Sequence, residues 1–307
     1  MDAAVNYVVN AIPGYSIGQQ VGTGAKSAIY LATELGTGKS YALKRVVKRE
    51  PRDQRYFEQV YTEFDVSSRT DHPALRRSYR LRKVRRWFRV REVLLLMEYV
   101  RGQTLEQSRP QDMNNIVEIF LKAAKGLEAL HQLGYVHADI KPNNIIVGPD
   151  GEVKIIDFGQ SCPMGFVKPR IQGTPDYIAP EQVRRLPLDQ RTDVFNFGAT
   201  LYWVLTNRPF PTLLPSRRPN GIELAHERAA ITPHEADPNV PAPLSRLVMD
   251  CCQSNPQERP GDIRQVIARL VVVQHVLKDR STPQDDDDSS DGCADRAESA
   301  DPPNRSS

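Results

Sequence analysis

Short runs of apolar and β-branched residues fill the first third of the chain, and glycine-containing segments separate them. β-Branched and aromatic residues suit an extended backbone. Strands are therefore predicted over residues 15–21, 28–31, 41–44 and 93–100. The glycines within 22–27 and 36–39 predict tight turns between neighbouring strands. Phe57 and Phe64 instead recur at helical spacing, which predicts one helix over about 56–69.

From about residue 112 onward, the apolar positions take on the spacing of helices. Ile116, Ile119 and Phe120 lie on one face of a predicted helix over 112–133, and Gly134 follows as a C-terminal cap. Further helices are predicted over residues 191–205, 243–253 and 261–278. The chain therefore changes from a strand-rich first part to a helix-rich second part.

The length of 307 residues allows about two domains or lobes, and the apolar content of 39% indicates polar tails. Residues 279–307 contain an acidic run at 285–291 and no apolar periodicity, which predicts a disordered acidic tail. Residues 1–13 are expected to form a loosely ordered extension. No apolar run approaches the roughly 20 residues that a membrane span needs. The four cysteines lack disulfide or zinc spacing, so we expect a cytoplasmic protein.

Residues 76–91 contain nine arginines and lysines and no acidic residue. The interleaved Leu81, Val84, Trp87 and Val90 predict twisted strands or a hairpin with an apolar inner face. We favour a solvated basic surface, because charge runs usually lie in water. The alternative is a docking site for an acidic partner or for the chain's own acidic tail. A nucleic-acid partner is disfavoured, since the net charge is only +3 and no nucleic-acid fold signature accompanies the segment.

Two polar clusters carry the candidate chemistry. The sequence His-Ala-Asp-Ile-Lys-Pro-Asn-Asn occupies 137–144, and Asp-Phe-Gly follows at 157–159. Between them, two β-branched runs flank a Pro-Asp-Gly turn, which predicts a β-hairpin over 145–156. The two ends of a hairpin lie side by side, so Asn144 and Asp157 are expected to meet. Their oxygens suit a hard cation such as Mg²⁺.

Asp139 is then left to orient or deprotonate a hydroxyl group, and Lys141 to neutralise a phosphate. The two clusters resemble the catalytic and metal-binding loops of the eukaryotic-like (Hanks-type) serine/threonine protein kinases, and the short, motif-spare form is closest to bacterial members. The resemblance covers about residues 15–278.

This resemblance implies an α+β, bilobal protein-kinase-like fold. A small lobe over about 14–100 would hold an antiparallel β-sheet and one main helix, and a larger, mostly helical lobe would cover about 101–278. The implied activity is transfer of the γ-phosphoryl group of ATP, with Mg²⁺, to Ser or Thr hydroxyls of protein substrates. Autophosphorylation is an outcome that such an activity allows.

The resemblance also assigns roles to individual residues. Asp139 would accept the substrate hydroxyl proton, Asn144 and Asp157 would hold Mg²⁺, and Lys141 is typical of members that act on Ser or Thr. Lys44 would contact the ATP phosphates and pair with Glu63; Glu58 is the rival partner and is expected to face solvent. The implied nucleotide-binding residues are Gly22, Thr23, Gly24, Ala25, Ser27, Ile29, Ala42, Lys44, Met97, Glu98, Val100 and Ile146.

Three positions depart from the family pattern. Ser27 replaces the third glycine of the glycine-rich loop, and Ser67 occupies a usually apolar position. Ala138 replaces an arginine that in many relatives pairs with a phosphate on the activation loop. We therefore predict an activity that does not need phosphorylation there; between Asp157 and Thr174, only Ser161 could accept a phosphate.

Two alternatives to an active protein kinase remain. A nucleotide-binding pseudokinase scaffold is disfavoured because Lys44, Asp139, Asn144 and Asp157 are all present. A small-molecule kinase is disfavoured by Lys141, and by Thr174 and the Ala-Pro-Glu triplet at 179–181, which resemble a protein-substrate segment. The resemblance further implies a buried ion pair between Glu181 and Arg259, and a structural role for Asp193 in anchoring the catalytic loop.

Overall fold

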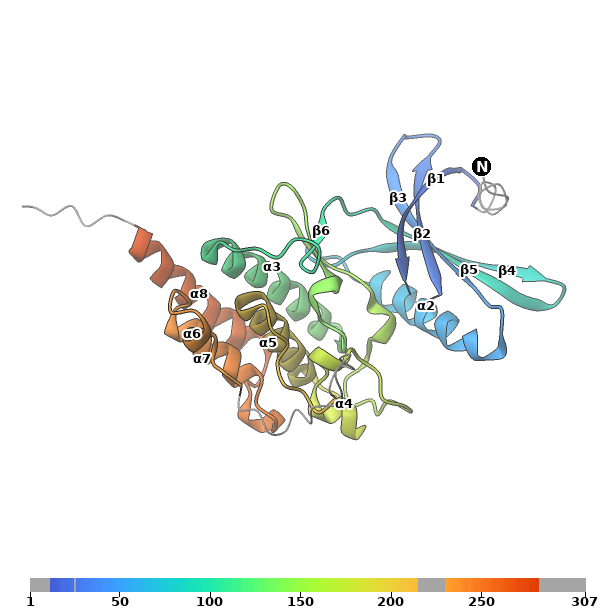
Figure 1. Cartoon of the computed structure of the whole chain (residues 1–307). Coiled ribbons are helices and arrows are strands. Elements are labelled where there is room, and N and C mark those ends of the chain that lie inside the picture. The colour runs from blue at the N-terminus through green and yellow to red at the C-terminus, as the bar shows by residue number, and fades with distance from the viewer. Residues whose placement is uncertain (1–11, 25, 215–229, 282–307) are drawn as a thin grey trace, which may run out of the picture.

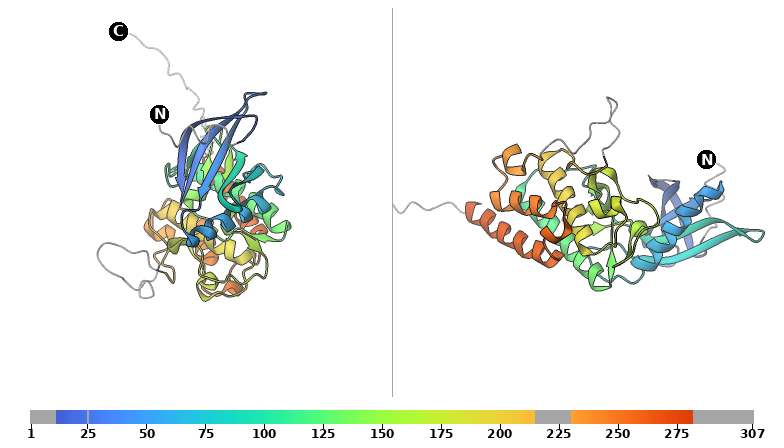
Figure 2. Two further views of the ribbon diagram at one scale, coloured as in Figure 1. Left: turned by 90° about the vertical axis from the view of Figure 1, so that its right-hand side faces the viewer. Right: turned by 90° about the horizontal axis from the view of Figure 1, so that it is seen from below.

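The computed structural model describes residues 12–24, 26–214 and 230–281. Most of the expected N-terminal extension, the candidate residue Ala25 and the acidic tail from residue 282 therefore lie outside the described residues. The chain forms a sheet-rich lobe at one end and a helical lobe at the other (Figures 1 and 2). This arrangement confirms the predicted bilobal α+β fold.

The first lobe is a five-stranded antiparallel sheet with the strand order β1-β2-β3-β5-β4. Its strands are β1 (Tyr15–Gly24), β2 (Ser27–Glu34), β3 (Ser40–Val47), β4 (Ser78–Arg86) and β5 (Arg89–Glu98). The main helix, α2 (Gln54–Ser67), packs on one face, where Phe57 and Val60 meet Val46 and Leu95. The predicted helix thus begins two residues earlier and ends two residues earlier than expected.

The opposite face of the sheet has its own small core, in which Tyr30, Leu43 and Leu96 pack with Ile12. Alternation along the central strands sends successive side chains to the two faces. Strands β3 and β5 are the most buried, because both faces of the sheet are covered there.

The basic segment forms the β4–β5 hairpin, as the sequence predicts. The expectation that Trp87 faces inward is wrong. Trp87 and Phe88 form the turn between paired Arg86 and Arg89, and their exposed fractions are 87% and 97%. Trp87 has φ 59°, a turn conformation that interrupts the alternation on which the expectation depended.

The second lobe is built around α3 (Met113–Gln132) and α5 (Gln190–Thr206), with α7 (Ala242–Cys251) and α8 (Ile263–Ser281) packed beside them. The side chain of Asp112 caps α3 by accepting from the Asn115 amide at 2.8 Å. Short helices α4 (Pro180–Arg184) and α6 (Pro233–Ala236) complete the helical part. No helix in the described ranges combines the length and apolar character needed to cross a bilayer.

Small strands place the candidate site where the lobes meet. β8 (Ile145–Val147) and β9 (Val153–Ile155) form the predicted hairpin and join β6 (Gln103–Thr104), while β7 (Tyr135–Val136) pairs with β10 (Cys162–Pro163). Gly102, at the passage between lobes, has φ 146°, and a Cβ there would collide with the Val147 carbonyl group. Only glycine fits this close approach.

A buried ion pair joins α4 to the end of the helical lobe. Arg259 donates to both carboxylate oxygens of Glu181 at 2.7 and 2.9 Å, and Thr192 donates to the same carboxylate at 2.9 Å. The guanidinium group also lies 4.9 Å from the centre of the Phe195 ring. Both charges are buried, so each depends on the other for compensation.

We expect Arg259→Leu to lower the free energy of unfolding by about 3–5 kcal/mol, because it leaves the Glu181 carboxylate buried and unpaired. The measurement is urea unfolding followed by circular dichroism. Arg264→Leu is the control: its exposed ion pair with Asp262 should leave the unfolding midpoint nearly unchanged. Equal midpoints for both variants would contradict this interpretation.

Candidate active site

Lys44 on β3 and Glu63 on α2 form the first ion pair of the site. Their Nζ and Oε2 atoms are 2.6 Å apart, and Nζ lies 3.5 Å from Oδ1 of Asp157. Glu63 is only 1% exposed, whereas the rival Glu58 faces solvent. Burial alone would lower the pKa of Lys44, but the Asp157 and Glu63 carboxylates outweigh it and the net pKa is raised. The lysine therefore stays charged.

Glu63 has a second cationic partner that the sequence analysis missed. Arg76, expected on the solvated basic surface, is instead buried, and its Nη2 donates to Oε1 of Glu63 at 2.7 Å. Its backbone amide donates to the carbonyl group of Ile155 at 3.0 Å. Arg76 lies before β4, so the alternation that exposes the later cations of the strand does not apply to it. Its place before the strand was the sequence feature that could have indicated its burial.

Ser67, one of the three departures from the family pattern, makes a polar contact in place of an apolar one. Its hydroxyl is buried, 2.6 Å from the hydroxyl of Ser78 at the start of β4. It also donates to the carbonyl group of Glu63. Helix α2 is thus held to the β4 side of the sheet by the Ser67–Ser78 contact and by the Glu63–Arg76 ion pair.

The catalytic-loop candidates form a closed triangle of side chains. Lys141 Nζ donates to Asp139 Oδ2 at 2.8 Å and to Thr174 Oγ1 at 2.7 Å, and Thr174 Oγ1 lies 2.9 Å from Asp139 Oδ1. Asp139 is buried, while Lys141 and Thr174 are half-buried. Each carboxylate oxygen of Asp139 therefore has a fixed partner.

Asn144 and Asp157 lie at one end of the β8–β9 hairpin, as the sequence predicts. Ile145 pairs with Ile155, and the amide of Ile156 donates to the Asn144 carbonyl group at 2.9 Å. The side-chain amide nitrogen of Asn144 is engaged by Asp139 at 2.8 and 3.3 Å, which leaves its amide oxygen as the free ligand atom. An amide oxygen and a carboxylate fit a divalent cation that also binds phosphate and water.

No group of three or more His, Cys, Asp or Glu side chains in the described ranges could hold a metal ion alone. Asp157 has φ 64°, a left-handed conformation that is uncommon outside glycine. The Lys44 ammonium group, aided by Arg76 and against the effect of burial, lowers the pKa of Asp157 to about 2.

Asp193 at the start of α5 anchors the catalytic loop. Its carboxylate accepts from the backbone amides of His137 and Ala138 at 2.8 and 2.7 Å, and Nε2 of His131 lies 2.8 Å away. Ala138 has φ 60°, so it is, with Asp157, a second non-glycine residue of the site in the left-handed region. Such conformations persist where the surroundings fix them, and the buried Asp193 carboxylate does so here. The expected structural role of Asp193 fits this geometry.

The nucleotide-binding candidates occupy both lobes. Gly22 pairs with Ile29, Thr23 with Ala28, and Gly24 with Ser27 at the tip of the β1–β2 hairpin. Ala42 on β3 pairs with the fully buried Met97 on β5. Glu98 ends β5, with its carboxylate 2.6 Å from Lys154, and Val100 follows in the connection to the second lobe. Ile146 lies on β8, in the second lobe.

The position of the missing arginine is occupied differently. Ala138 packs in an apolar cluster with Val136, Cys162 and Leu188. Lys168, from the segment after Asp157, is only 6% exposed and its ammonium group binds the Gln160 carbonyl group. Burial lowers the pKa of Lys168, against the opposite effects of Cys162 and the Asp139 carboxylate. A cation of the activation segment itself therefore lies near this cluster.

These features define a two-lobed protein with a lysine–glutamate pair in the sheet lobe and an Asp–Lys–Thr triangle in the helical lobe. A family model for the protein kinase domain matches residues 15–272. The chain belongs to the protein kinase family, so the resemblance inferred from its motifs is confirmed.

Named relatives agree with this family. A probable serine/threonine-protein kinase of Clostridium acetobutylicum is 27% identical over 271 residues, which are 85% of this chain and 40% of the relative. The serine/threonine-protein kinase PknB of Mycobacterium tuberculosis is 27% identical over 274 residues, 85% of this chain and 43% of the relative. PknB of Mycobacterium leprae is 28% identical over 269 residues, with 84% and 43% coverage. The chain spans less than half the length of these relatives.

Asp157→Asn tests the electrostatics of the site. Because the folded pKa of Asp157 is below the ordinary value, its charge stabilises the folded chain above that value, and this stabilisation is lost as the pH falls towards about 2. The free energy difference between the unmodified chain and Asp157→Asn should be constant above about pH 5 and shrink below about pH 4. Urea titrations at several pH values measure it.

Proposed function

We propose that this protein is an ATP-dependent serine/threonine protein kinase that transfers the γ-phosphoryl group to Ser or Thr hydroxyls of protein substrates. The observation that carries the proposal is the triangle of Asp139, Lys141 and Thr174, which aims a fixed carboxylate beside a cation. A hydroxyl group needs such a carboxylate to orient it, and a phosphoryl group needs such a cation. The names of the relatives support the same activity.

Asp139 would orient the substrate hydroxyl and accept its proton as the oxygen–phosphorus bond forms. Lys141 would offset charge on the transferred group, and Lys44, held by Glu63, would bind the other phosphates. Mg²⁺ bound with ATP would supply further charge neutralisation, and Asn144 and Asp157 are the residues that would hold it. Catalysis would be chiefly positioning and charge stabilisation.

The ATP site would combine elements of both lobes. The backbone at Gly22, Thr23, Gly24 and Ser27 would cover the phosphates, because glycine allows amide groups to approach them closely. Ile29, Ala42 and Ile146 would enclose the adenine ring, with Met97 at the back of the pocket. The carbonyl group of Glu98 and the backbone of Val100 would bind the adenine edge. Ala25 belongs to the same proposal.

A pseudokinase scaffold and a small-molecule kinase are the competing functions. The Lys44–Glu63 pair is intact, which argues against a scaffold that has lost catalysis. Thr174 donates to Asp139 at 2.9 Å, the contact that the resemblance implies for members that phosphorylate Ser or Thr, and this favours a protein substrate. A cytoplasmic location is part of the proposal, and the buried, free Cys162, Cys251 and Cys252 are compatible with a reducing compartment.

The proposal includes an activity that does not depend on phosphorylation of the activation segment. Ser161, the one acceptor between Asp157 and Thr174, is only 4% exposed, so another kinase could not reach it without local opening. Lys168 would order the activation segment as a phosphate does in many relatives. Its ammonium group binds the carbonyl group of Gln160, which directly follows the Asp-Phe-Gly sequence and ends the short turn Phe158–Gln160.

Asp139→Asn should lower phosphate transfer on the order of 10²–10⁴-fold, because it removes the proton acceptor while keeping the shape of the side chain. Incubation with labelled ATP and a generic basic protein, followed by mass spectrometry of both proteins, measures transfer and residue preference. Asp150→Asn, in the exposed β8–β9 turn, is the matched control and should behave as the unmodified chain. Equal incorporation by Asp139→Asn would favour the scaffold.

Lys168→Met should lower kcat roughly tenfold or more, because the segment that carries Thr174 loses its internal support. KM for ATP should stay the same, and Lys168→Arg should restore much of kcat by keeping the positive charge. Phosphatase treatment of the unmodified chain should change neither constant. Loss of activity after that treatment, with recovery when Ser161 is phosphorylated, would contradict the prediction.

A further inference from the structure

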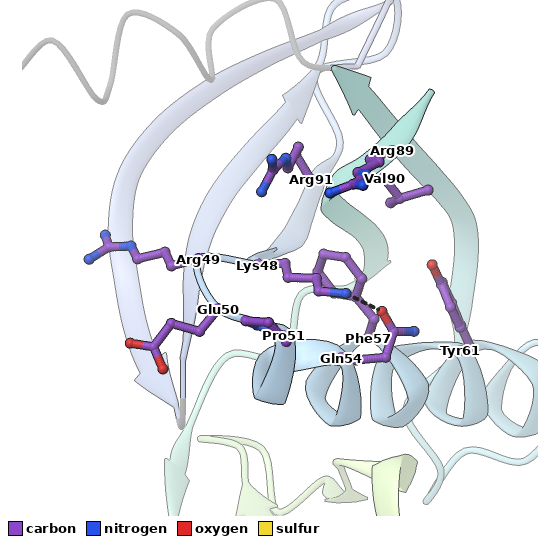
Figure 3. Close-up of a pocket in the computed structure, with 10 residues that line it drawn as sticks. All are labelled: Lys48, Arg49, Glu50, Pro51, Gln54, Phe57, Tyr61, Arg89, Val90 and Arg91. Atoms are coloured by element: carbon purple, nitrogen blue, oxygen red, sulfur yellow. Dashed lines mark hydrogen bonds between the residues drawn. The ribbon is translucent and has the colours of Figure 1, made fainter. Parts of the chain in front are cut away.

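A pocket of about 490 Å³ opens on the sheet lobe between the β3–α2 connection, helix α2 and strand β5 (Figure 3). Its helical wall carries Gln54, Phe57 and Tyr61, spaced for one face of α2. At 100° per residue, Glu63 projects from nearly the opposite face of that helix. The pocket is therefore separate from the candidate active site, and nothing in the proposed phosphate transfer uses it.

The rim of the pocket is strongly basic. Lys48 and Arg49 come from the β3–α2 connection, and Arg89 and Arg91 from β5 on the other side; the Arg49 side chain extends away from the hollow (Figure 3). Within the described ranges, none of these four side chains pairs with a carboxylate; Lys48 instead donates to Gln54 at 2.9 Å. The acidic lining residue, Glu50, is already paired with Arg52 outside the pocket. The rim thus presents three cations, Lys48, Arg89 and Arg91, that have no acidic partner in the described part of the chain.

The interior of the pocket is apolar and aromatic. Phe57 is buried at its base, and Tyr61 and Val90 are half-buried along its walls. Trp87 and Phe88 are exposed at the hairpin turn, immediately before Arg89 on the rim. Exposed aromatics beside arginines are the residue types that dominate binding energy at protein interfaces.

The charge and shape of the pocket indicate what kind of ligand it could bind. A hollow of this size accepts one or two apolar side chains, whereas a nucleic-acid backbone needs a continuous cationic track. Three cations without acidic partners around an apolar base instead match a peptide in which an apolar residue is flanked by acids.

The acidic tail of the same molecule does not meet these requirements. Residues 282–307 contain no aromatic residue and no Leu, Ile, Val or Met to fill the pocket. The run that ends at Asp291 lies at most ten residues beyond α8, a reach of about 36 Å. Helix α8 itself is ~28 Å long, and it ends at the side of the helical lobe that lies away from the β4–β5 hairpin (Figure 1). The acidic run could therefore extend back along little more than the length of α8.

We propose that this pocket is a docking site for an acidic segment of a separate protein, with an apolar side chain of that segment inserted between α2 and β5. Acidic side chains on either side would pair with the cations from the β3–α2 connection and from β5. Docking at this distance from Asp139 would recruit the partner without occupying the place of the phosphorylated hydroxyl.

The test is fluorescence anisotropy of a labelled peptide in which one Phe is flanked by Glu residues, titrated with the full chain. We expect saturable binding that weakens with added salt, and at least a tenfold loss of affinity in Arg89→Glu/Arg91→Glu. The matched control is Lys125→Glu/Arg246→Glu, which reverses two exposed charges on the helical lobe and should bind as the unmodified chain does. A peptide with Ser in place of Phe should bind at least tenfold more weakly.

Three results would overturn the proposal: no measurable binding by the unmodified chain, equal affinity in the two double variants, or preference for a single-stranded oligonucleotide or phosphatidylserine vesicles over the peptide. Phosphate transfer to a basic substrate should be unchanged in Arg89→Glu/Arg91→Glu, and thermal unfolding of each variant checks its fold. This readout distinguishes failure of docking from failure of the proposed enzymatic function.

Discussion

The buried carboxylate of Glu63 fixes the position of the sheet lobe relative to the candidate site. Removing an ionised carboxylate from water costs several kcal/mol, so Glu63 is stable only while both of its oxygens are paired. Lys44 occupies one oxygen and Arg76 the other. Arg76 is in turn bonded through its backbone to Ile155, two residues before Asp157. A single side chain therefore connects β3, α2 and the hairpin that carries the metal-binding candidate.

The helical lobe has a counterpart in Asp193. That carboxylate is also buried and also multiply bonded, but its partners are backbone amides of the catalytic loop rather than cations. Each lobe thus uses one satisfied buried acid to fix the conformation of a loop, and both loops contain a non-glycine residue in the left-handed region. The two acids position different groups. Glu63 positions the side chains of Lys44 and Arg76, whereas Asp193 positions the backbone of the loop that carries Asp139.

Much of this arrangement was readable from the sequence, because hydrophobic spacing and short motifs are local properties. The strands, the long helices and the β8–β9 hairpin followed from such patterns, and the Lys44–Glu63 pairing from the resemblance to the protein kinases. Arg76 and Trp87 did not. Their places depend on where β4 begins and where its turn falls, and the basic run has too little apolar contrast to fix either. The burial of Lys168 is equally nonlocal, since it lies near Asp139 and Asp193 from other parts of the chain.

The small side chain at position 138 and the enclosed Lys168 and Ser161 have a consequence for regulation. If the proposal is right, a segment that is held by its own lysine would give a phosphatase nothing to remove, and the buried Ser161 would be out of reach of other kinases. Output would then follow the amount of protein that the cell makes and degrades, and the supply of nucleotide and partner. Such a protein would act as a constant source whose signal is set by dosage and by encounter, rather than as a relay that is switched by an upstream enzyme.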